Sequence, residues 1–170
     1  MPRSAEGPDA SPAQRPASRW AGRREARRLA LASIFEADFG QRTAGAILER
    51  HLDDGAVSAD NADFARSLVA AVVAHREVID ATIARTAPAY PVGQLARMDR
   101  SLLRSALGEV LHSPATPTTV AIAEWVELAR SYSGEPCRRL LNGVLGRVVA
   151  GAADTGPVIG PDAGHTAERS

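Results

Sequence analysis

Five arginines within ten residues are the first candidates for chemistry in this sequence. They are Arg19, Arg23, Arg24, Arg27 and Arg28, and only Glu25 opposes them. On a helix, Arg23 and Arg27 share a face with Arg24 and Arg28 beside them, and like charges at that spacing repel. The cluster also lies near the positive end of the helix dipole, where cations are disfavoured. Because two local rules are broken, the cluster indicates an anionic partner such as RNA or DNA, and the alternative is a solvated polar face.

Arginine is the only side chain that carries positive charge at neutral pH here, because the chain contains no lysine. A guanidinium group can bind phosphate with two parallel hydrogen bonds or stack on a base. A second group of arginines follows at Arg97, Arg100 and Arg104. These residues either extend a basic surface or form ion pairs with Asp99 and Glu109 on the same predicted helix. The net charge is zero, so the composition alone does not argue for nucleic acid.

Nothing in the sequence has the spacing of a catalytic or metal site. The histidines at 51, 75, 112 and 165 lie far apart, and Cys137 is the one cysteine. Glu124 and Glu127 could do acid–base work, yet no nucleophile or metal ligand accompanies them. There is no glycine-rich phosphate loop. We therefore expect a protein that is not an enzyme and that has no metal or cofactor.

The elements that must position these residues are helices. Apolar residues recur at three- and four-residue spacing in six segments, and no segment has the period of a strand. We expect helices at about 21–39, 43–52, 59–87, 92–112, 116–131 and 135–150. The loops are short, which favours antiparallel packing. The sequence therefore predicts an all-α fold of two packed three-helix bundles, with subdomains at about 19–87 and 92–150 inside one domain, 19–150.

Both ends of the chain differ from this pattern. Residues 1–18 and 151–170 are rich in proline or glycine and lack a periodic apolar face, so we expect disordered tails. The first residues contain no apolar run typical of a signal peptide, and no stretch approaches the length of a membrane span. With a single cysteine, these features favour a cytoplasmic protein.

Four segments together resemble the NusB family of transcription antitermination factors. They are R-R-E-A-R-R-L-A-L-A-S-I-F-E at 23–36, the run from Phe64 to Asp80, M-D-R-S-L-L-R-S-A-L-G-E-V-L at 98–111, and the run from Pro117 to Leu145 that contains L-L-N-G-V-L. They occur in the family's order and cover about residues 22–149. The resemblance implies a factor that binds the boxA element of ribosomal RNA leaders with the ribosomal protein NusE, loads onto RNA polymerase and promotes ribosomal RNA transcription.

The resemblance also implies site residues. The family's basic start falls on Arg23, Arg24, Arg27 and Arg28, and a further RNA contact falls on Arg139. The partner surface would involve Phe35 and Asp99. Three positions depart from the family pattern, because Leu140 stands where a stacking ring is usual, Gly108 where Tyr is usual and Ala123 where Asn is usual.

Other functions fit the same residues. A helical protein–protein adaptor would leave the arginines solvated and would not bind RNA. An RNA-binding module of an RNA methyltransferase would precede a catalytic domain, and this sequence ends without one. A helical DNA-binding protein would prefer duplex DNA over RNA. The sequence also leaves open a homodimer that covers the arginine face.

Overall fold

The computed structural model describes residues 16–55 and 57–154. In this part of the chain the elements are helical, in the order α1 (Pro16–Ala37), α2 (Ala44–Leu52), α3 (Ala59–Ala74), α4 (Arg76–Thr86), a 3-10 turn η1 (Val92–Gln94), α5 (Arg97–His112), α6 (Thr118–Ser133) and α7 (Glu135–Asp154). The all-α prediction is confirmed. None of the described helices combines the length and apolar character needed to cross a membrane.

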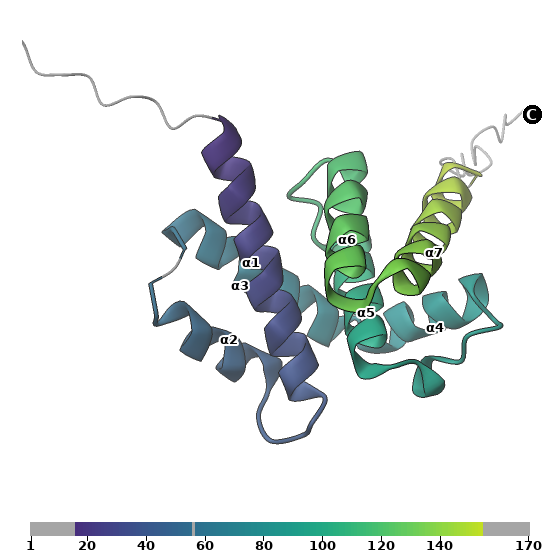
Figure 1. Ribbon diagram of the computed structural model, residues 1–170, viewed down its shortest axis with the longest axis horizontal. Helices are drawn as coiled ribbons and strands as arrows, with labels where there is room; N and C mark the ends of the chain where they lie inside the picture. The colour runs from purple at the N-terminus through teal and green to yellow at the C-terminus, as the bar shows by residue number, and fades with distance from the viewer. Residues whose placement is uncertain (1–15, 56, 155–170) are drawn as a thin grey trace, which may run out of the picture.

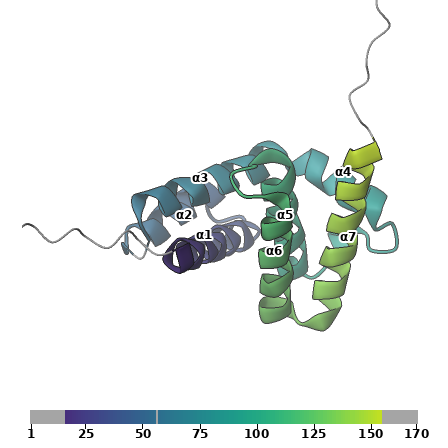
Figure 2. The ribbon, with the colours of Figure 1, turned by 90° about the horizontal axis from the view of Figure 1, so that it is seen from above.

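Helix α5 lies at the centre of the molecule. It packs against α1 and α3 on one side and against α4, α6 and α7 on the other, as Figures 1 and 2 show. Every residue from Ser101 to Glu109 is buried, including the charged side chains of Arg104 and Glu109. A helix that is surrounded on all faces must satisfy its polar groups internally, so these two charges need partners within the protein.

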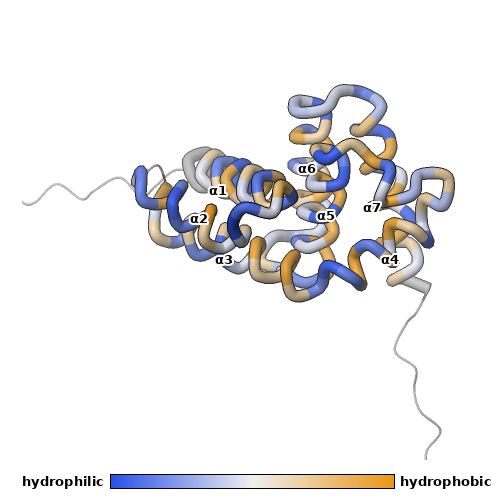
Figure 3. The backbone as a smooth tube through the Cα atoms, turned by 90° about the horizontal axis from the view of Figure 1, so that it is seen from below, coloured by the Kyte–Doolittle hydropathy of each residue, from blue (hydrophilic) through white to orange (hydrophobic). Residues whose placement is uncertain are grey.

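One continuous apolar core joins the two bundles. It runs from Ala26 on α1 through Leu68 on α3 and Leu103 on α5 to Trp125 on α6 and Leu145 on α7. Apolar and polar segments alternate along each helix in Figure 3, which is the pattern of elements that each bury one face. The core is built mainly of aliphatic side chains and alanine, consistent with an aromatic content of 4%.

The predicted helix at 59–87 is two helices. The backbone breaks at His75 (φ −112°, ψ 17°), which ends α3 and begins α4. After the break, α4 packs against α5 and α7, where Ile79 and Ile83 are both fully buried. If α3 continued straight, Ile79 and Ile83 would not reach α5 and α7. The helix breaks at His75 because the break allows both side chains to be buried there. The first half of the chain therefore contributes a helix to the second bundle.

The remaining differences concern helix ends. The predicted helix at 92–112 starts as the η1 turn, and α5 itself begins at Arg97. Helix α1 begins at Pro16 and α7 continues to Asp154, so both helices extend a few residues into the predicted tails. Glycine costs a helix only about 1 kcal/mol relative to alanine, so Gly151 does not stop α7. The rest of the two predicted tails, 1–15 and 155–170, lies outside the described residues.

Candidate nucleic-acid and partner interfaces

Arg27 is inside the protein, which contradicts its prediction as a surface RNA contact. Its side chain is fully buried, and its Nε and Nη2 donate to the two carboxylate oxygens of Glu109 at 2.9 and 2.7 Å. It also donates to Thr116, while Trp125 Nε1 donates to the same carboxylate at 2.7 Å. A cation held in this way ties α1 to α5 and α6 and is not available to phosphate.

Arg23 is half-buried at the edge of the same helix. Its guanidinium lies over the Phe64 ring at 4.3 Å from the ring centre, a cation–π contact between α1 and α3. Its Nη1 is buried and finds no hydrogen-bond partner among the described residues. Arg23 therefore has a packing role, and its unpartnered Nη1 lies inside the protein.

Among the arginines of the cluster whose side chains the structure describes, Arg24 and Arg28 are exposed. Arg24 donates to both carboxylate oxygens of Glu124 on α6 at 2.8 and 2.7 Å, and this contact holds the pKa of Glu124 below its usual value. Arg28 makes a longer 3.4 Å contact with Glu25 on its own helix. The sequence suggested a strongly basic face, whereas in the structure Arg24 is well neutralised and Arg28 only weakly so.

Arg139 lies away from this cluster, on α7. In Figure 1, α6 stands between α1 and α7. Arg139 is exposed, and its ion pair within the described part of the chain is a 3.9 Å contact with Glu135. It lines a hollow with the end of α4 and the following loop, residues 87–90. The structure thus places the predicted RNA residues on two helices, α1 and α7, and buries Arg27.

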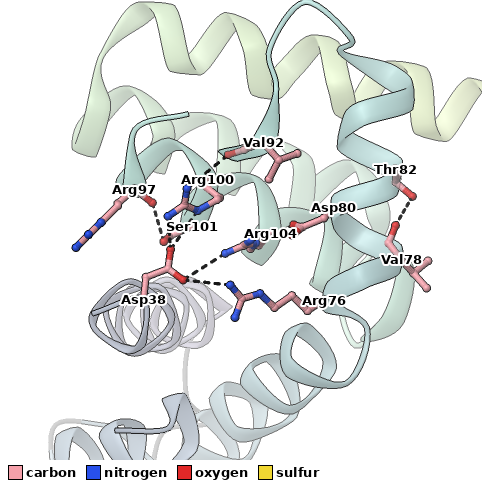
Figure 4. Close-up of polar contacts among 10 residues, drawn as sticks. All are labelled: Asp38, Arg76, Val78, Asp80, Thr82, Val92, Arg97, Arg100, Ser101 and Arg104. Carbon is pink, nitrogen blue, oxygen red and sulfur yellow. Dashed lines mark hydrogen bonds and ion pairs between the residues drawn. The ribbon is translucent and has the colours of Figure 1, made fainter. Parts of the chain in front are cut away.

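Arginines on α4 and α5 converge on one carboxylate at the end of α1. Asp38 contacts Arg100 at 2.8 Å, Arg104 at 3.3 Å and Arg76 at 3.6 Å (Figure 4). Arg104 also makes a two-pronged contact with Asp80, both hydrogen bonds at 2.8 Å. These contacts fix the end of α1 against α4 and α5. They show that Arg104 is structural and does not extend a basic surface.

The two predicted partner residues lie near the Asp38 contacts. Phe35 is at the end of α1, and Asp99 is near the start of α5. Phe35 packs edge-to-face on Phe39, with ring centres 5.4 Å apart, and Arg97 lies over the Phe39 ring at 4.4 Å. Arg97 begins α5, two residues before Asp99. The Phe39 ring is 51% exposed, which makes it the most accessible apolar side chain of this surface. We call Phe35, Phe39 and Arg97 the α1–α5 surface; Asp99 lies two residues along α5 from Arg97, on the side of the helix that faces Ser133 of α6.

Asp99 is anchored by a residue of α6. The Ser133 hydroxyl at the end of α6 donates to its carboxylate. Cys137 lies close by, and burial together with the negative charge of Asp99 raises the pKa of this thiol to about 12. Cys137 is therefore an inert buried thiol, and Asp99 is held in one orientation.

No group of three or more metal-binding side chains occurs among the described residues. The stacked rings of His75 and His112, 3.9 Å apart, are the closest approach of two histidines there. A pair of parallel rings without a carboxylate or thiolate beside it does not form a zinc site.

Some of these roles had a signal in the sequence that we did not use. Arg27 lies four residues before Leu31 and seven before Ile34, so it belongs to the apolar stripe of α1. Glu109 lies seven residues after Leu102, so it belongs to the apolar stripe of α5. A charge on each of two apolar stripes indicates a buried ion pair. Asp38, Phe39 and Tyr90 had no such signal, because they lie outside the helices in turns or loops.

The chain matches known proteins over nearly all of the described residues. The model of the NusB family matches residues 24–150. The transcription antitermination protein NusB of Dehalococcoides mccartyi (strain ATCC BAA-2266) is 40% identical over 133 residues, which are 78% of this chain and 93% of that protein. The protein of the same name from Symbiobacterium thermophilum is 39% identical over 137 residues, 76% of this chain and 90% of that protein.

Solved structures agree with this match. T. maritima NusB superposes with a TM-score of 0.70 at 28% identity and covers 75% of this chain and 90% of its own. A NusB solved with NusE and double-stranded RNA has a TM-score of 0.69 at 22% identity, covers 77% of this chain and 98% of its own, and supports the fold. On its sequence and its fold, this chain belongs to the NusB family of transcription antitermination proteins.

Proposed function

We propose that this protein binds the boxA element of ribosomal RNA leaders together with the ribosomal protein NusE and thereby promotes ribosomal RNA transcription. The observation that carries the proposal is the family match over residues 24–150, with relatives named for transcription antitermination. The described residues offer two exposed surfaces that suit the two partners. Loading of the complex onto RNA polymerase would follow.

The RNA surface on α1 would be made by Arg24 and Arg28, with the half-buried Arg23 beside them. Phosphate contacts supply most of the affinity for nucleic acid, and contacts with base edges supply the selectivity. Arg27 takes no part, because it is buried against Glu109. Phosphate must compete with Glu124 for Arg24, so affinity in the absence of a partner should be modest.

The α1–α5 surface is the proposed site for NusE. An exposed aromatic ring beside an arginine is typical of the residues that dominate protein interfaces. Because Asp99 is held by Ser133, it loses little side-chain entropy on binding. RNA affinity should rise when both proteins are present, since each partner would extend the surface available to the RNA.

Fluorescence anisotropy of a labelled boxA RNA, with and without NusE and at several salt concentrations, tests the proposal. We expect binding that strengthens with NusE and weakens with log salt at a slope of about −2 to −3, corresponding to three or four phosphates. Arg28→Gln should weaken binding and flatten the slope. The matched control is Arg66→Gln, which removes one exposed arginine from α3.

A protein–protein adaptor remains the second candidate, because carboxylates within the protein neutralise Arg24 and Arg27. It predicts binding to NusE without salt-dependent affinity for RNA. Competition between RNA and duplex DNA of the same sequence also separates the proposal from a DNA-binding role.

A further inference from the structure

Phe64 of α3 contacts two arginines that lie four residues apart on α1. The two helices pack side by side (Figures 1 and 2). The Arg23 guanidinium is 4.3 Å from the centre of the Phe64 ring, and the Arg27 guanidinium is 5.2 Å from it. The ring is only 4% exposed and belongs to the apolar core, so packing fixes its position. One rigid ring therefore contacts a buried arginine and a partly exposed one.

The two arginines differ in what neutralises them. Glu109 accepts hydrogen bonds from Nε and Nη2 of Arg27, so the charge of Arg27 is balanced inside the protein. Within residues 16–55 and 57–154, no carboxylate forms an ion pair with Arg23, whose guanidinium lies on the face of the Phe64 ring. An aromatic face attracts a cation without neutralising it. Arg23 thus keeps its full charge.

One edge of the Arg23 guanidinium faces away from the protein interior. Nη1 is buried while the side chain as a whole is partly exposed, so an anion can approach only from the edge with Nε and Nη2. Arg24 and Arg27 use this same edge to bind their carboxylates with two hydrogen bonds each. A guanidinium binds phosphate in the same two-pronged way. Arg23 therefore presents to solvent the edge that suits a phosphate.

A guanidinium that is already held in place binds phosphate more tightly than a mobile one. Arginine has much rotamer entropy, and part of it is lost when a ligand holds the side chain. Contact with a rigid ring removes part of this freedom before RNA arrives. Arg28, by contrast, has a 3.4 Å contact with Glu25, and Arg24 must first leave Glu124. Among the described arginines of the cluster, Arg23 is therefore the best prepared for phosphate.

We propose that Phe64 is a positioning residue for RNA binding, because its ring holds the Arg23 guanidinium with the Nε and Nη2 edge towards a phosphate of the RNA. The proposal rests on the proposed function, and it adds to that function a core residue that does not itself touch RNA. An aliphatic side chain would fill much of the same space without attracting the cation. The effect of removing the ring should therefore depend on the presence of Arg23.

A double-mutant cycle on the affinity for boxA RNA tests this role, with anisotropy measured on the full chain and NusE over a salt series. Phe64→Leu should weaken binding by about 2-fold to 12-fold, the range for losing the order of one side chain. Its salt slope should stay unchanged, because Arg23 keeps its charge. Arg23→Gln should weaken binding and reduce the magnitude of the slope by about 0.7, the value for one phosphate on a single strand. In the Arg23→Gln background, Phe64→Leu should have no further effect.

Further variants separate positioning from general damage to the core. Phe64→Tyr keeps the aromatic face and should bind RNA like the unmodified protein. Leu68→Val shortens a fully buried side chain one turn further along α3 and should not change RNA affinity. Phe64→Leu combined with Arg28→Gln should give additive losses, since the exposed Arg28 pairs with Glu25 and not with the ring. Circular dichroism melting checks the fold of each variant, and Phe64→Met takes the place of Phe64→Leu if that variant does not fold.

Each outcome decides for or against the role of Phe64. Coupling of Phe64→Leu with Arg23→Gln, together with additivity towards Arg28→Gln, supports it. If Phe64→Leu causes no loss, or the same loss with and without Arg23, Phe64 does not position Arg23, although the proposed function stands. Unchanged binding by Arg23→Gln overturns the proposal in the same way. If the unmodified protein does not bind boxA RNA even with NusE, the proposed function is overturned as well.

Discussion

Arg27 of α1 and Glu109 of α5 form an ion pair in the interior of the protein, both side chains being almost fully buried. Two hydrogen bonds of 2.9 and 2.7 Å join them, and Trp125 and Thr116 satisfy further positions. Arg27, which belongs to the arginine cluster of α1, thus helps to hold the two bundles together. The basic segment therefore serves stability as well as any binding role.

Arg27→Met should destabilise the protein by about 3–5 kcal/mol, because it leaves the Glu109 carboxylate buried without a cation. Urea unfolding followed by circular dichroism measures the change. Arg66→Met is the matched control, since it breaks an exposed pair with Glu49 and should hardly move the unfolding midpoint. A loss below about 1 kcal/mol for Arg27→Met would show that Glu109 is neutralised in another way.

Gly108→Ala should also destabilise the protein, although alanine is the better helix former. A Cβ at Gly108 would lie 2.4 Å from Val72 Cγ2, and Val72 is a stiff, buried side chain on α3. Overpacking of this kind costs about 1–3 kcal/mol. The control is Gly146→Ala on α7, where nothing lies within 4 Å and a gain of up to about 1 kcal/mol is expected. Addition of Val72→Ala should recover part of the loss; equal stability of Gly108→Ala and the parent would contradict the packing.

Glu124→Gln should strengthen RNA binding by freeing Arg24. The carboxylate now accepts two hydrogen bonds from Arg24, and removal of its charge leaves the guanidinium available to phosphate. Anisotropy with boxA RNA should show a lower Kd and a steeper salt dependence. Glu49→Gln, which frees Arg66 on α3, controls for the general change in charge. Equal effects of both substitutions would mean that Arg24 does not contact RNA.

The stability of the protein should fall as the pH is lowered through about 6.5, the ordinary pKa of histidine. Burial, with a smaller contribution from the charge of His75, lowers the pKa of His112 in the folded state. The unfolded chain therefore takes up a proton at His112 before the folded protein does, and stability decreases as pH falls from the unfolded towards the folded pKa. Urea unfolding at pH 7.5 and 5.5 measures this loss. In His112→Gln the loss should be smaller, and an unchanged loss would assign it to other groups.

Helical periodicity was enough to predict the fold class and the six apolar segments. It did not predict the break at His75, because Leu68, Val72, Ile79 and Ile83 keep their spacing across it. The break is decided by tertiary packing, since α4 finds its apolar partners on α5 and α7. A local pattern contains no information on which neighbour a stripe will meet.

The candidate site was predicted less completely. Charge density along the chain located the basic segment, but it could not show which arginines face a carboxylate distant in sequence. Arg24 pairs with Glu124, and Arg27 pairs with Glu109. The family resemblance gave Arg139, Phe35 and Asp99 as site residues, and their roles stay predictions. Leu140 and Gly108 were noted as departures, and the structure explains Gly108 by its contact with Val72.

The complete burial of α5 from Ser101 to Glu109 has a consequence for how the protein can be divided. Each bundle uses a different side of this one helix as its interior wall, so neither has a closed core without it. A fragment that ends before Arg97 would expose the inner faces of α1 and α3 to water, and a fragment that begins there would lack α4. The two bundles therefore form one cooperative unit. Any duplication or exchange of one bundle would have to include α5.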